Sequence, residues 1–342
     1  MAGTITSLSF ASRTFLLSTS EDGTINLYRA RDWSLMRTLR GHSGRINSAS
    51  AHPSGRVALS VGADRTIRMW DLMRGVGSAS VKIGIEAELV RWDTLGKRFA
   101  VMAQRQAMVF ATDMTKLAEV ERRERLHDVS FLRAPVAGGA EHELMFVATE
   151  AGTAIVYDLD ALEQAADEDT APSPSELARL VGHRNRVRSV CALRAQTADG
   201  SEHVLATTIS SDGYVRVFSL ADALRSGDKP ELESVAEFNT KRSRLTCLSV
   251  VGFDVAAEMG DLEEEPEGEG LDAFDEEDEE EANDEDSDAE LERLEEQVRQ
   301  AREAGLVLED DEDEDEGIGE DEEVGEDEGE EEEEEDEEPE EE

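Results

Sequence analysis

The 342-residue chain carries 34 Lys and Arg against 83 Asp and Glu, a formal net charge of −49 at pH 7. Residues 1–257 contain 31 basic and 32 acidic residues, whereas residues 258–342 contain 3 basic and 51 acidic residues. The first part is long enough for a large core, but the second is too acidic and too poor in apolar residues to fold, so we expect it to be disordered. There is no signal peptide and no apolar run near the roughly 20 residues that span a bilayer, so we expect an intracellular, soluble protein.

The first 75 residues contain two copies of one pattern. In residues 4–40, apolar runs flank the turn at 20–23, and in residues 41–75 two β-type runs flank the turn at 62–65. Asp22 and Asp64 lie 42 residues apart, and each has a serine four residues before it and an aromatic residue six after it. A repeat of roughly 40–45 residues that opens on Gly-His and closes on Trp-Asp is typical of a WD-type propeller blade.

The spacing in the second repeat predicts a buried hydrogen-bonded chain. Each member of this chain can satisfy the hydrogen-bonding group of the next; the members are His42, Ser60, Asp64 and Trp70. A buried polar group left unpaired would cost about 1–3 kcal/mol. The register extends this structural role to Ser18 and Asp22 of the first repeat. A Ser–His–Asp set could alternatively be a hydrolase triad, but a chain does not usually repeat its catalytic centre at regular spacing.

The later repeats are less regular. In residues 84–120 Gln104 replaces the turn Asp, and residues 125–182 form a fourth repeat with insertions at 133–142 and 160–176 that we expect to be surface loops. The fifth repeat recovers the signature with His183, Thr208 and Asp212, while Phe218 takes the tryptophan position and donates nothing. A sixth begins with a predicted strand at 244–250 and stops.

These repeats predict an all-β WD40 propeller over residues 1–257, with about five blades and one extra strand. A propeller normally closes, so that its blades cover one another's faces and edges. Here no strand precedes the first repeat to close the ring. Either the ring is open or N-terminal blades are missing from the sequence, and we expect the second.

Two further features have structural interpretations. Residues 288–304 of the acidic tail place Leu291, Leu294, Val298 and Ala301 on one face of a possible short helix, which is too short for an independent coiled coil. Cys191 and Cys247 match neither a metal site nor a disulfide framework, so we expect buried free thiols.

Four arginines share one register. Each stands immediately before the first aliphatic residue of an inner strand; they are Arg45, Arg125, Arg186 and Arg244. Equivalent positions of a propeller lie on the same rim. The pattern is therefore either scattered surface charge or a partner-binding face for rRNA phosphate or an acidic protein segment.

The sequence resembles a known family in several segments. These are HPSGRVALSVG (52–62) with DRT (64–66) and WDL (70–72), SEDGTI (20–25), Asp32-Trp33, ELVRW (88–92) and RLTCL (244–248). They resemble the PAK-interacting, maintenance-of-killer WD-repeat family over residues 3 to about 255. The resemblance implies a seven-bladed propeller, a nuclear and nucleolar location, and a role in assembling the large ribosomal subunit. Animal relatives are also described as restraining PAK-family kinases. The sequence departs from the family in its start and in its acidic tail.

No nucleotide-binding loop, dinucleotide fingerprint or zinc motif is present, so we expect no enzyme, cofactor, metal, membrane contact or small-molecule substrate. The leading hypothesis is a non-catalytic scaffold in 60S assembly and rRNA maturation, with ribosome assembly proteins and pre-ribosomal particles as expected partners and rRNA as a candidate contact. One alternative is a signalling adaptor that binds a PAK-type kinase. The other is an acidic-tailed chaperone of histones or other basic proteins.

Overall fold

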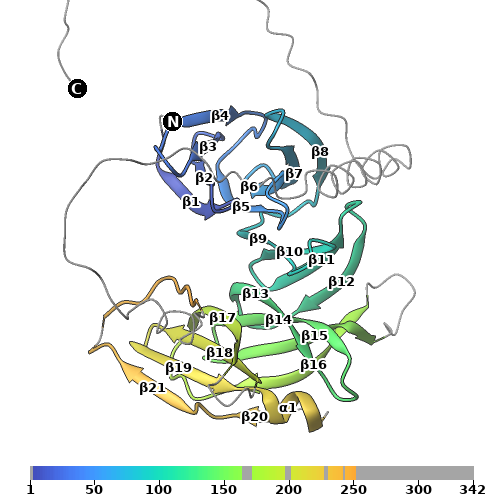
Figure 1. Ribbon diagram of the computed structural model, residues 1–342, viewed down its shortest axis with the longest axis vertical. Helices are drawn as coiled ribbons and strands as arrows, with labels where there is room; N and C mark the ends of the chain where they lie inside the picture. Colours follow the sequence, from blue (N-terminus) through green and yellow to red (C-terminus); the bar gives the residue numbers. More distant parts are fainter. Residues whose placement is uncertain (1–2, 164–171, 197–201, 227–229, 242, 252–342) are drawn as a thin grey trace, which may run out of the picture. The chain divides into compact units, whose positions relative to one another are not determined.

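The computed structural model describes residues 3–163, 172–196, 202–226, 230–241 and 243–251. These residues form five antiparallel four-stranded sheets, one with an added fifth strand, which we call blades 1 to 5 in chain order (Figure 1). Blade 1 contains β1 (Ile5–Phe10), β2 (Phe15–Ser20), β3 (Ile25–Arg29) and β4 (Leu35–Leu39). Blade 2 contains β5 (Ile46–Ala51), β6 (Val57–Gly62), β7 (Thr66–Asp71) and β8 (Val76–Lys82). Blade 3 contains β9 (Leu89–Trp92), β10 (Arg98–Ala103), β11 (Gln106–Ala111) and β12 (Lys116–Glu121).

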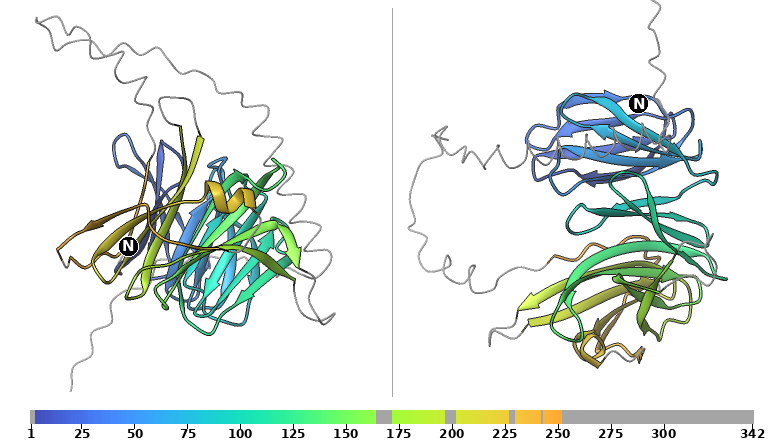
Figure 2. Two further views of the ribbon diagram at one scale, coloured as in Figure 1. Left: turned by 90° about the horizontal axis from the view of Figure 1, so that it is seen from below. Right: turned by 90° about the vertical axis from the view of Figure 1, so that its right-hand side faces the viewer.

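A short strand between the last two strands of blade 5 joins blade 4. Blade 4 contains β13 (Leu126–Pro135), β14 (Glu141–Thr149), β15 (Ala154–Glu163) and β16 (Ser173–Leu180). Blade 5 contains β17 (Val187–Gln196), β18 (Glu202–Ser210), β19 (Tyr214–Ser219) and β21 (Ala236–Asn239). Between β19 and β21 the chain forms helix α1 (Ala221–Ser226), the short coil in Figure 2, and strand β20 (Glu231–Leu232), which pairs in parallel with β16. This added strand joins the outer edge of blade 4 to blade 5.

The all-β character follows from the local sequence. In blade 2, β6 reads VALSVG and is buried at every position, as expected for a strand covered on both faces by its neighbours. Its register with β7 pairs Val57 with Asp71 and Val61 with Ile67, so the turn between these strands is short. The expected WD40 propeller fold is confirmed in all five blades.

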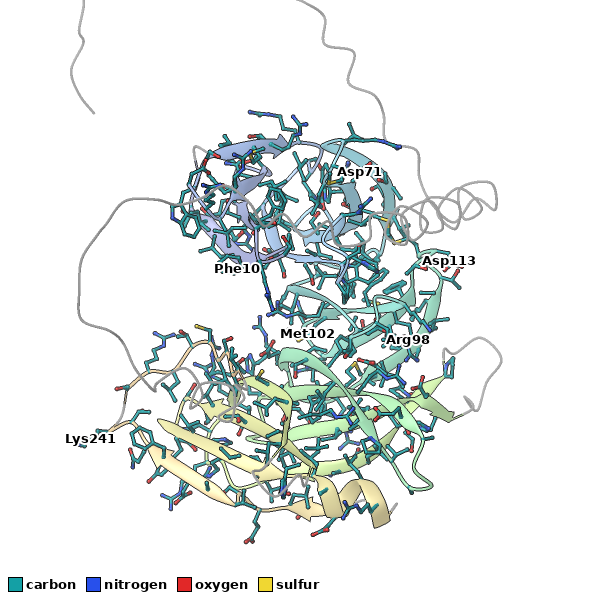
Figure 3. All side chains as sticks on the ribbon, viewed as in Figure 1. Phe10, Asp71, Arg98, Met102, Asp113 and Lys241 are labelled. Carbon is teal, nitrogen blue, oxygen red and sulfur yellow. The ribbon has the colours of Figure 1, made fainter. Side chains whose placement is uncertain are left out.

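The core lies between successive blades, not inside any one of them. Four hydrophobic clusters each combine residues of two neighbouring blades, and the inner strands β1, β5, β9, β13 and β17 contact one another in that order (Figure 3). Because a single sheet cannot bury both faces alone, stacking supplies most of the apolar burial.

Buried polar bonds also join the blades. His52 Nε2 of blade 2 lies 3.0 Å from the carbonyl of Gly96 in blade 3. Asp128 of blade 4 accepts from the hydroxyl of Ser189 at 2.5 Å and from the amide of Val190 at 3.2 Å, both in blade 5. Burial raises the pKa of Asp128, although these hydrogen bonds oppose the shift. Such bonds fix the register of neighbouring blades because their donors and acceptors are out of reach of water.

Three sequence expectations are corrected. The segments 133–142 and 160–176 are not simply loops, because β13, β14, β15 and β16 extend into them; buried Ala134 and Leu144 anchor the first extension. The predicted strand at 244–250 does not form, since no edge in the described part of the chain pairs with it. The two thiols are free, but Cys191 is only half-buried and Cys247 is exposed.

The acidic tail and the possible helix at 288–304 lie outside the described residues. Among the residues that are described, no helix has the length and hydropathy needed to cross a membrane.

Candidate functional site

Four side chains of blade 2 form one hydrogen-bonded chain. His42 Nδ1 lies 2.6 Å from Oδ2 of Asp64, and His42 Nε2 lies 2.6 Å from Oγ of Ser60. Trp70 Nε1 donates to the same serine oxygen at 2.7 Å. Because tryptophan can only donate and the carboxylate can only accept, Ser60 donates to His42, and His42 donates to Asp64.

The same chain excludes a hydrolase triad at this position. Ser60 has an exposed fraction of 0% and lies under Trp70, so no substrate reaches its hydroxyl. A nucleophile has to be accessible to the bond that it attacks. The arrangement of serine, histidine and aspartate in blade 2 is therefore structural.

Asp64 ties two loops together. It accepts from the amide of Ser43, in the segment before β5, and from the amide and hydroxyl of Thr66, at the start of β7. Burial opposes ionisation of Asp64, but the hydrogen bond from His42, together with the bonds from Thr66, outweighs it and lowers the pKa of Asp64 to about 2. The loops at this end of blade 2 are held rigidly.

Blade 5 repeats the arrangement with one member fewer. His183 Nε2 lies 2.7 Å from Oγ1 of Thr208, and its Nδ1 lies 3.1 Å from Oδ2 of Asp212, which also accepts from the amide of Arg184. Burial lowers the pKa of His183. Burial also opposes ionisation of Asp212, but backbone hydrogen bonds and His183 keep its pKa below the usual range. Phe218 is fully buried in the tryptophan position and has no polar hydrogen to offer.

Blade 1 keeps the aspartate end of the pattern. Asp22 accepts from the amide of Thr24 at 3.0 Å and from its hydroxyl at 2.6 Å. Ser18 is buried, with an exposed fraction of 2%. The turn after β2 is therefore held in the same way as the turn after β6.

The four arginines in register do not form one positive face. Arg45 donates to Glu86 at 3.0 Å and Arg125 to Glu88 at 2.8 Å. Arg186 donates to the hydroxyl of Ser211, and Arg244 is exposed outside any strand. The prediction of four equivalent arginines is wrong for Arg244, because the strand that would carry it is not formed.

The two glutamates were missed by sequence reasoning, although one signal was present. Glu88 stands immediately before Leu89, the first residue of β9, and thus occupies in blade 3 the position that Arg45 and Arg125 occupy in blades 2 and 4. Glu86 had no such signal. The aligned position therefore alternates in charge from blade 2 to blade 4.

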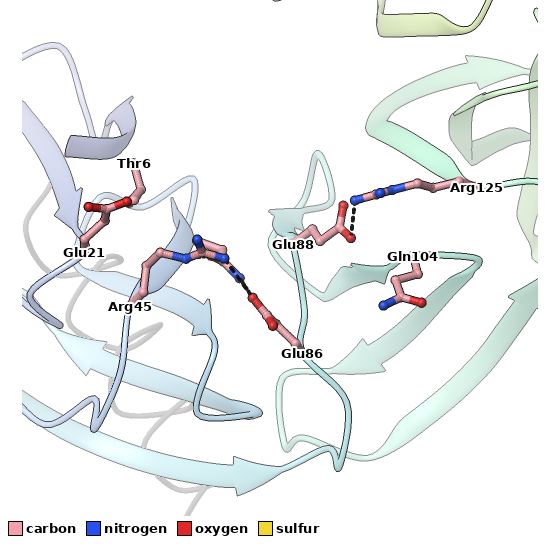
Figure 4. Close-up of a pocket in the computed structure, with 8 residues that line it drawn as sticks. Thr6, Glu21, Arg45, Glu86, Glu88, Gln104 and Arg125 are labelled. Carbon is pink, nitrogen blue, oxygen red and sulfur yellow. Dashed lines mark hydrogen bonds and ion pairs between the residues drawn. The ribbon is translucent and has the colours of Figure 1, made fainter. Parts of the chain in front are cut away.

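These charged pairs line a cavity of about 540 Å³, which we call the rim cavity (Figure 4). It lies where β5, β9 and β13 begin, and its walls are Thr6, Glu21, Arg45, Asn47, Glu86, Glu88, Gln104 and Arg125. Asn47 and Arg45 both donate to Glu86, and these bonds lower its pKa. The walls carry both charges, so the cavity suits a polar segment of a partner better than an apolar ligand.

A second cavity, of about 620 Å³, shares Glu86 and Gln104 with the rim cavity and lies between the β6–β7 turn of blade 2 and the β10–β11 turn of blade 3. Blade 3 has neither the histidine nor the turn aspartate, and Gln104 takes a left-handed conformation with φ of 50°. In blades 2 and 5 the His–Asp bond draws the preceding loop onto the turn. In blade 3 this bond is absent, and the second cavity lies beside its β10–β11 turn.

One group among the described residues has potential metal ligands close together: His142, Asp158 and Asp160. His142 Nδ1 already lies 2.7 Å from Asp158, and Arg98 forms an ion pair of 2.9 Å with Asp160. The guanidinium supplies the positive charge that these carboxylates require, so we assign them a structural role.

The WD40 family model (WD domain, G-beta repeat) matches residues 33–71 and 174–219. A Gallus gallus protein named p21-activated protein kinase-interacting protein 1-like is 28% identical over 75% of this chain and 62% of its own length. Its Xenopus laevis counterpart is 30% identical over 72% of this chain and 60% of its own length. Protein MAK11 of Saccharomyces cerevisiae is 27% identical over 69% of this chain and 56% of its own length.

The chain is a WD-repeat homologue of the PAK-interacting protein 1 and MAK11 proteins. This WD-repeat homologue spans about 60% of the length of the curated relatives that it matches. Its structure resembles the Swd1 β-propeller domain of Myceliophteria thermophila with a TM-score of 0.51 and 19% identity, covering 70% of this chain and 72% of that one. At that identity the likeness establishes the propeller fold alone.

Proposed function

We propose that this WD-repeat protein is a non-catalytic scaffold for assembly of the large ribosomal subunit, acting in the nucleolus during rRNA maturation. The homology to MAK11 and the family resemblance of residues 52–72 support this proposal. The fold is consistent with it, because propellers present rigid loops to several partners.

The observation that carries the proposal is the rim cavity with its exchangeable ion pairs. Side chains of the Arg45–Glu86 pair are 48% and 44% exposed, and those of the Arg125–Glu88 pair are 51% and 30% exposed. Exposed ion pairs contribute only about 0–1 kcal/mol, so a partner can replace them at little cost. The loop that carries Arg45 is held by the His42 and Asp64 chain, which keeps this wall of the cavity preorganised.

The test is sedimentation of the tagged full-length protein from nuclear extract. We expect wild-type protein to cosediment with 60S precursors, and the double variant Arg45→Glu, Arg125→Glu to shift to the free fractions. Lys97→Glu is the matched control, since Lys97 is exposed, unpaired among the described residues, and absent from the rim cavity. Wild-type protein found only in free fractions would refute the proposal.

A second candidate is a kinase adaptor, because several relatives are named as p21-activated protein kinase-interacting proteins. Copurification with the kinase and not with ribosomal precursors would favour it. Deletion of residues 258–342 tests the remaining alternative, a chaperone of basic proteins: binding of histones should then be lost while docking through the propeller is kept.

A further inference from the structure

Trp33 adopts a backbone conformation that suits glycine. Its φ is 57°, and its amide donates to the carbonyl of Arg29, the last residue of β3. In blade 2 the equivalent residue is Gly75, with φ of 79° and an amide bonded to the last residue of β7, Asp71. A left-handed conformation is strained for a residue with a bulky side chain, so glycine would adopt it at position 33 with less backbone strain than Trp33.

Burial does not compensate for this strain. The Trp33 side chain is 60% exposed, whereas Met114, which has φ of 67° in the corresponding turn of blade 3, is 4% exposed. Met114 packs in the core between blades 2 and 3. Trp33 has no comparable packing role, and an exposed tryptophan held in a strained turn is typical of an interaction anchor.

Other exposed apolar side chains belong to the neighbouring turn. Met73, between β7 and β8, and Val76, the first residue of β8, are 58% and 53% exposed. This turn and the turn of Trp33 end equivalent strands of adjacent blades, so they lie on the same face. Arg37 of β4, in the blade of Trp33, reaches the turn of blade 2: a Cβ added to Gly75 would be 3.0 Å from Arg37 Cδ.

The charges next to these side chains are unbalanced. Asp32 is bonded to the amide and hydroxyl of Ser34 and paired with Arg29. Asp71 of blade 2 (Figure 3) is likewise bonded within its own turn and paired with Arg74. Among the described residues, Arg31 and Arg37 have no ion pair. Both carboxylates are thus hydrogen-bonded and paired within their own turns, whereas the guanidinium groups of Arg31 and Arg37 are available to pair with carboxylates of a partner.

We infer that Trp33, Met73, Val76, Arg31 and Arg37 form a docking surface for an acidic, amphipathic segment of a partner protein. Its leucine-like side chains would pack on Trp33, and its carboxylates would pair with the two arginines. A protein is favoured over single-stranded RNA because one aromatic ring among aliphatic side chains offers no stacking platform for successive bases.

This surface is separate from the rim cavity. Glu21, in the turn before β3, lines the rim cavity, while Trp33 follows the other end of β3. The two sites therefore lie at opposite ends of one strand. The inference does not depend on the proposed function.

Intrinsic fluorescence of the full-length protein tests the inference directly. The protein has three tryptophans, and Trp70 and Trp92 are only 1% and 7% exposed, so acrylamide quenching reports mainly Trp33. The probe is a synthetic peptide with leucine at helical spacing and glutamate at the other positions. We expect it to shift the emission to the blue and to protect Trp33 from acrylamide.

Variants are compared by anisotropy of the labelled peptide. Trp33→Gly and Arg37→Glu should each weaken binding by about tenfold or more, while Lys97→Glu binds as wild type. Trp33→Gly should keep or raise the melting temperature because it relieves the strained turn, whereas Met114→Gly should lower it.

Several results would overturn the inference. These are no protection by the glutamate peptide, equal protection by a peptide with lysine in place of glutamate, or protection by oligouridylate instead. A melting temperature of Trp33→Gly that falls as far as that of Met114→Gly would show that Trp33 is a structural residue.

Discussion

The Nδ1 atom of His42 lies 2.6 Å from Oδ2 of Asp64, and this contact joins the segment before β5 to the turn after β6. The same carboxylate accepts from Ser43 and Thr66, so one side chain holds three points of the chain. The contact is buried on both sides, with side-chain exposed fractions of 0% and 5%.

Asp64→Ala should lower the free energy of unfolding by about 1–3 kcal/mol, because it leaves buried donors of His42 and Thr66 unpaired. Urea denaturation of the full-length protein measures the loss. Asp22→Ala is the control, since Asp22 is exposed and bonded to Thr24 at the equivalent turn, and it should cost less. Unchanged stability of Asp64→Ala would contradict the structural role.

Stability should depend on pH through Asp64 in the acidic range. The pKa of Asp64 is lowered from the ordinary 3.8 of an aspartate to about 2 in the folded protein, so the folded state holds the carboxylate in its charged form. This contribution, about 2 kcal/mol, is present above pH 4 and is lost as the pH falls toward 2. Denaturation curves at several pH values should show it in wild type but not in Asp64→Asn. Identical pH dependence of both proteins would refute the prediction.

Trp70→Phe should cost about 2 kcal/mol or more, because the bond from Nε1 to Ser60 is lost and the smaller ring leaves a cavity at this buried site. Blade 5 has phenylalanine, Phe218, at the equivalent position. The variant should therefore still fold, and the loss of unfolding free energy should be moderate. Trp33→Phe, at an exposed site, is the control and should be close to neutral. A loss for Trp33→Phe that matches Trp70→Phe would show that ring size, and not the hydrogen bond, is responsible.

Gly62→Ala should destabilise blade 2 by about 1–3 kcal/mol, since an added Cβ would lie 2.3 Å from the carbonyl oxygen of Arg45. That carbonyl also accepts from the amide of Ala63, so the substitution should displace the arginine of the rim cavity. Gly44→Ala, whose Cβ would meet its nearest atom at 3.5 Å, is the control, because Gly44 is next to Arg45 in the segment before β5. Thermal denaturation distinguishes the two, and equal melting temperatures would refute the steric argument.

The periodic features were accessible from the sequence. Spacing alone predicts the turn aspartates, the strands of blades 1 to 3 and the members of the His42 chain. Each repeat is one supersecondary unit, so its polar and apolar positions recur. His183, Thr208 and Asp212 were found in the same way, although Phe218 replaces tryptophan. A repeated pattern carries this information because it constrains the same contacts in every blade.

Contacts between repeats were decided only by the tertiary structure. Glu86 and Glu88 neutralise Arg45 and Arg125, β20 crosses to blade 4, and the segment at 244–250 forms no strand. The ion pairs and the position of β20 depend on which side chains and strand edges of different blades meet. The conformation of residues 244–250 depends on whether another strand pairs with them. The sequence by itself thus determined the blades and their internal hydrogen bonds, because these contacts are local and recur at a fixed period. The charge balance of the rim cavity and the exposure of Trp33 were set by the packing of one blade against the next, because those contacts join residues with no fixed spacing along the chain.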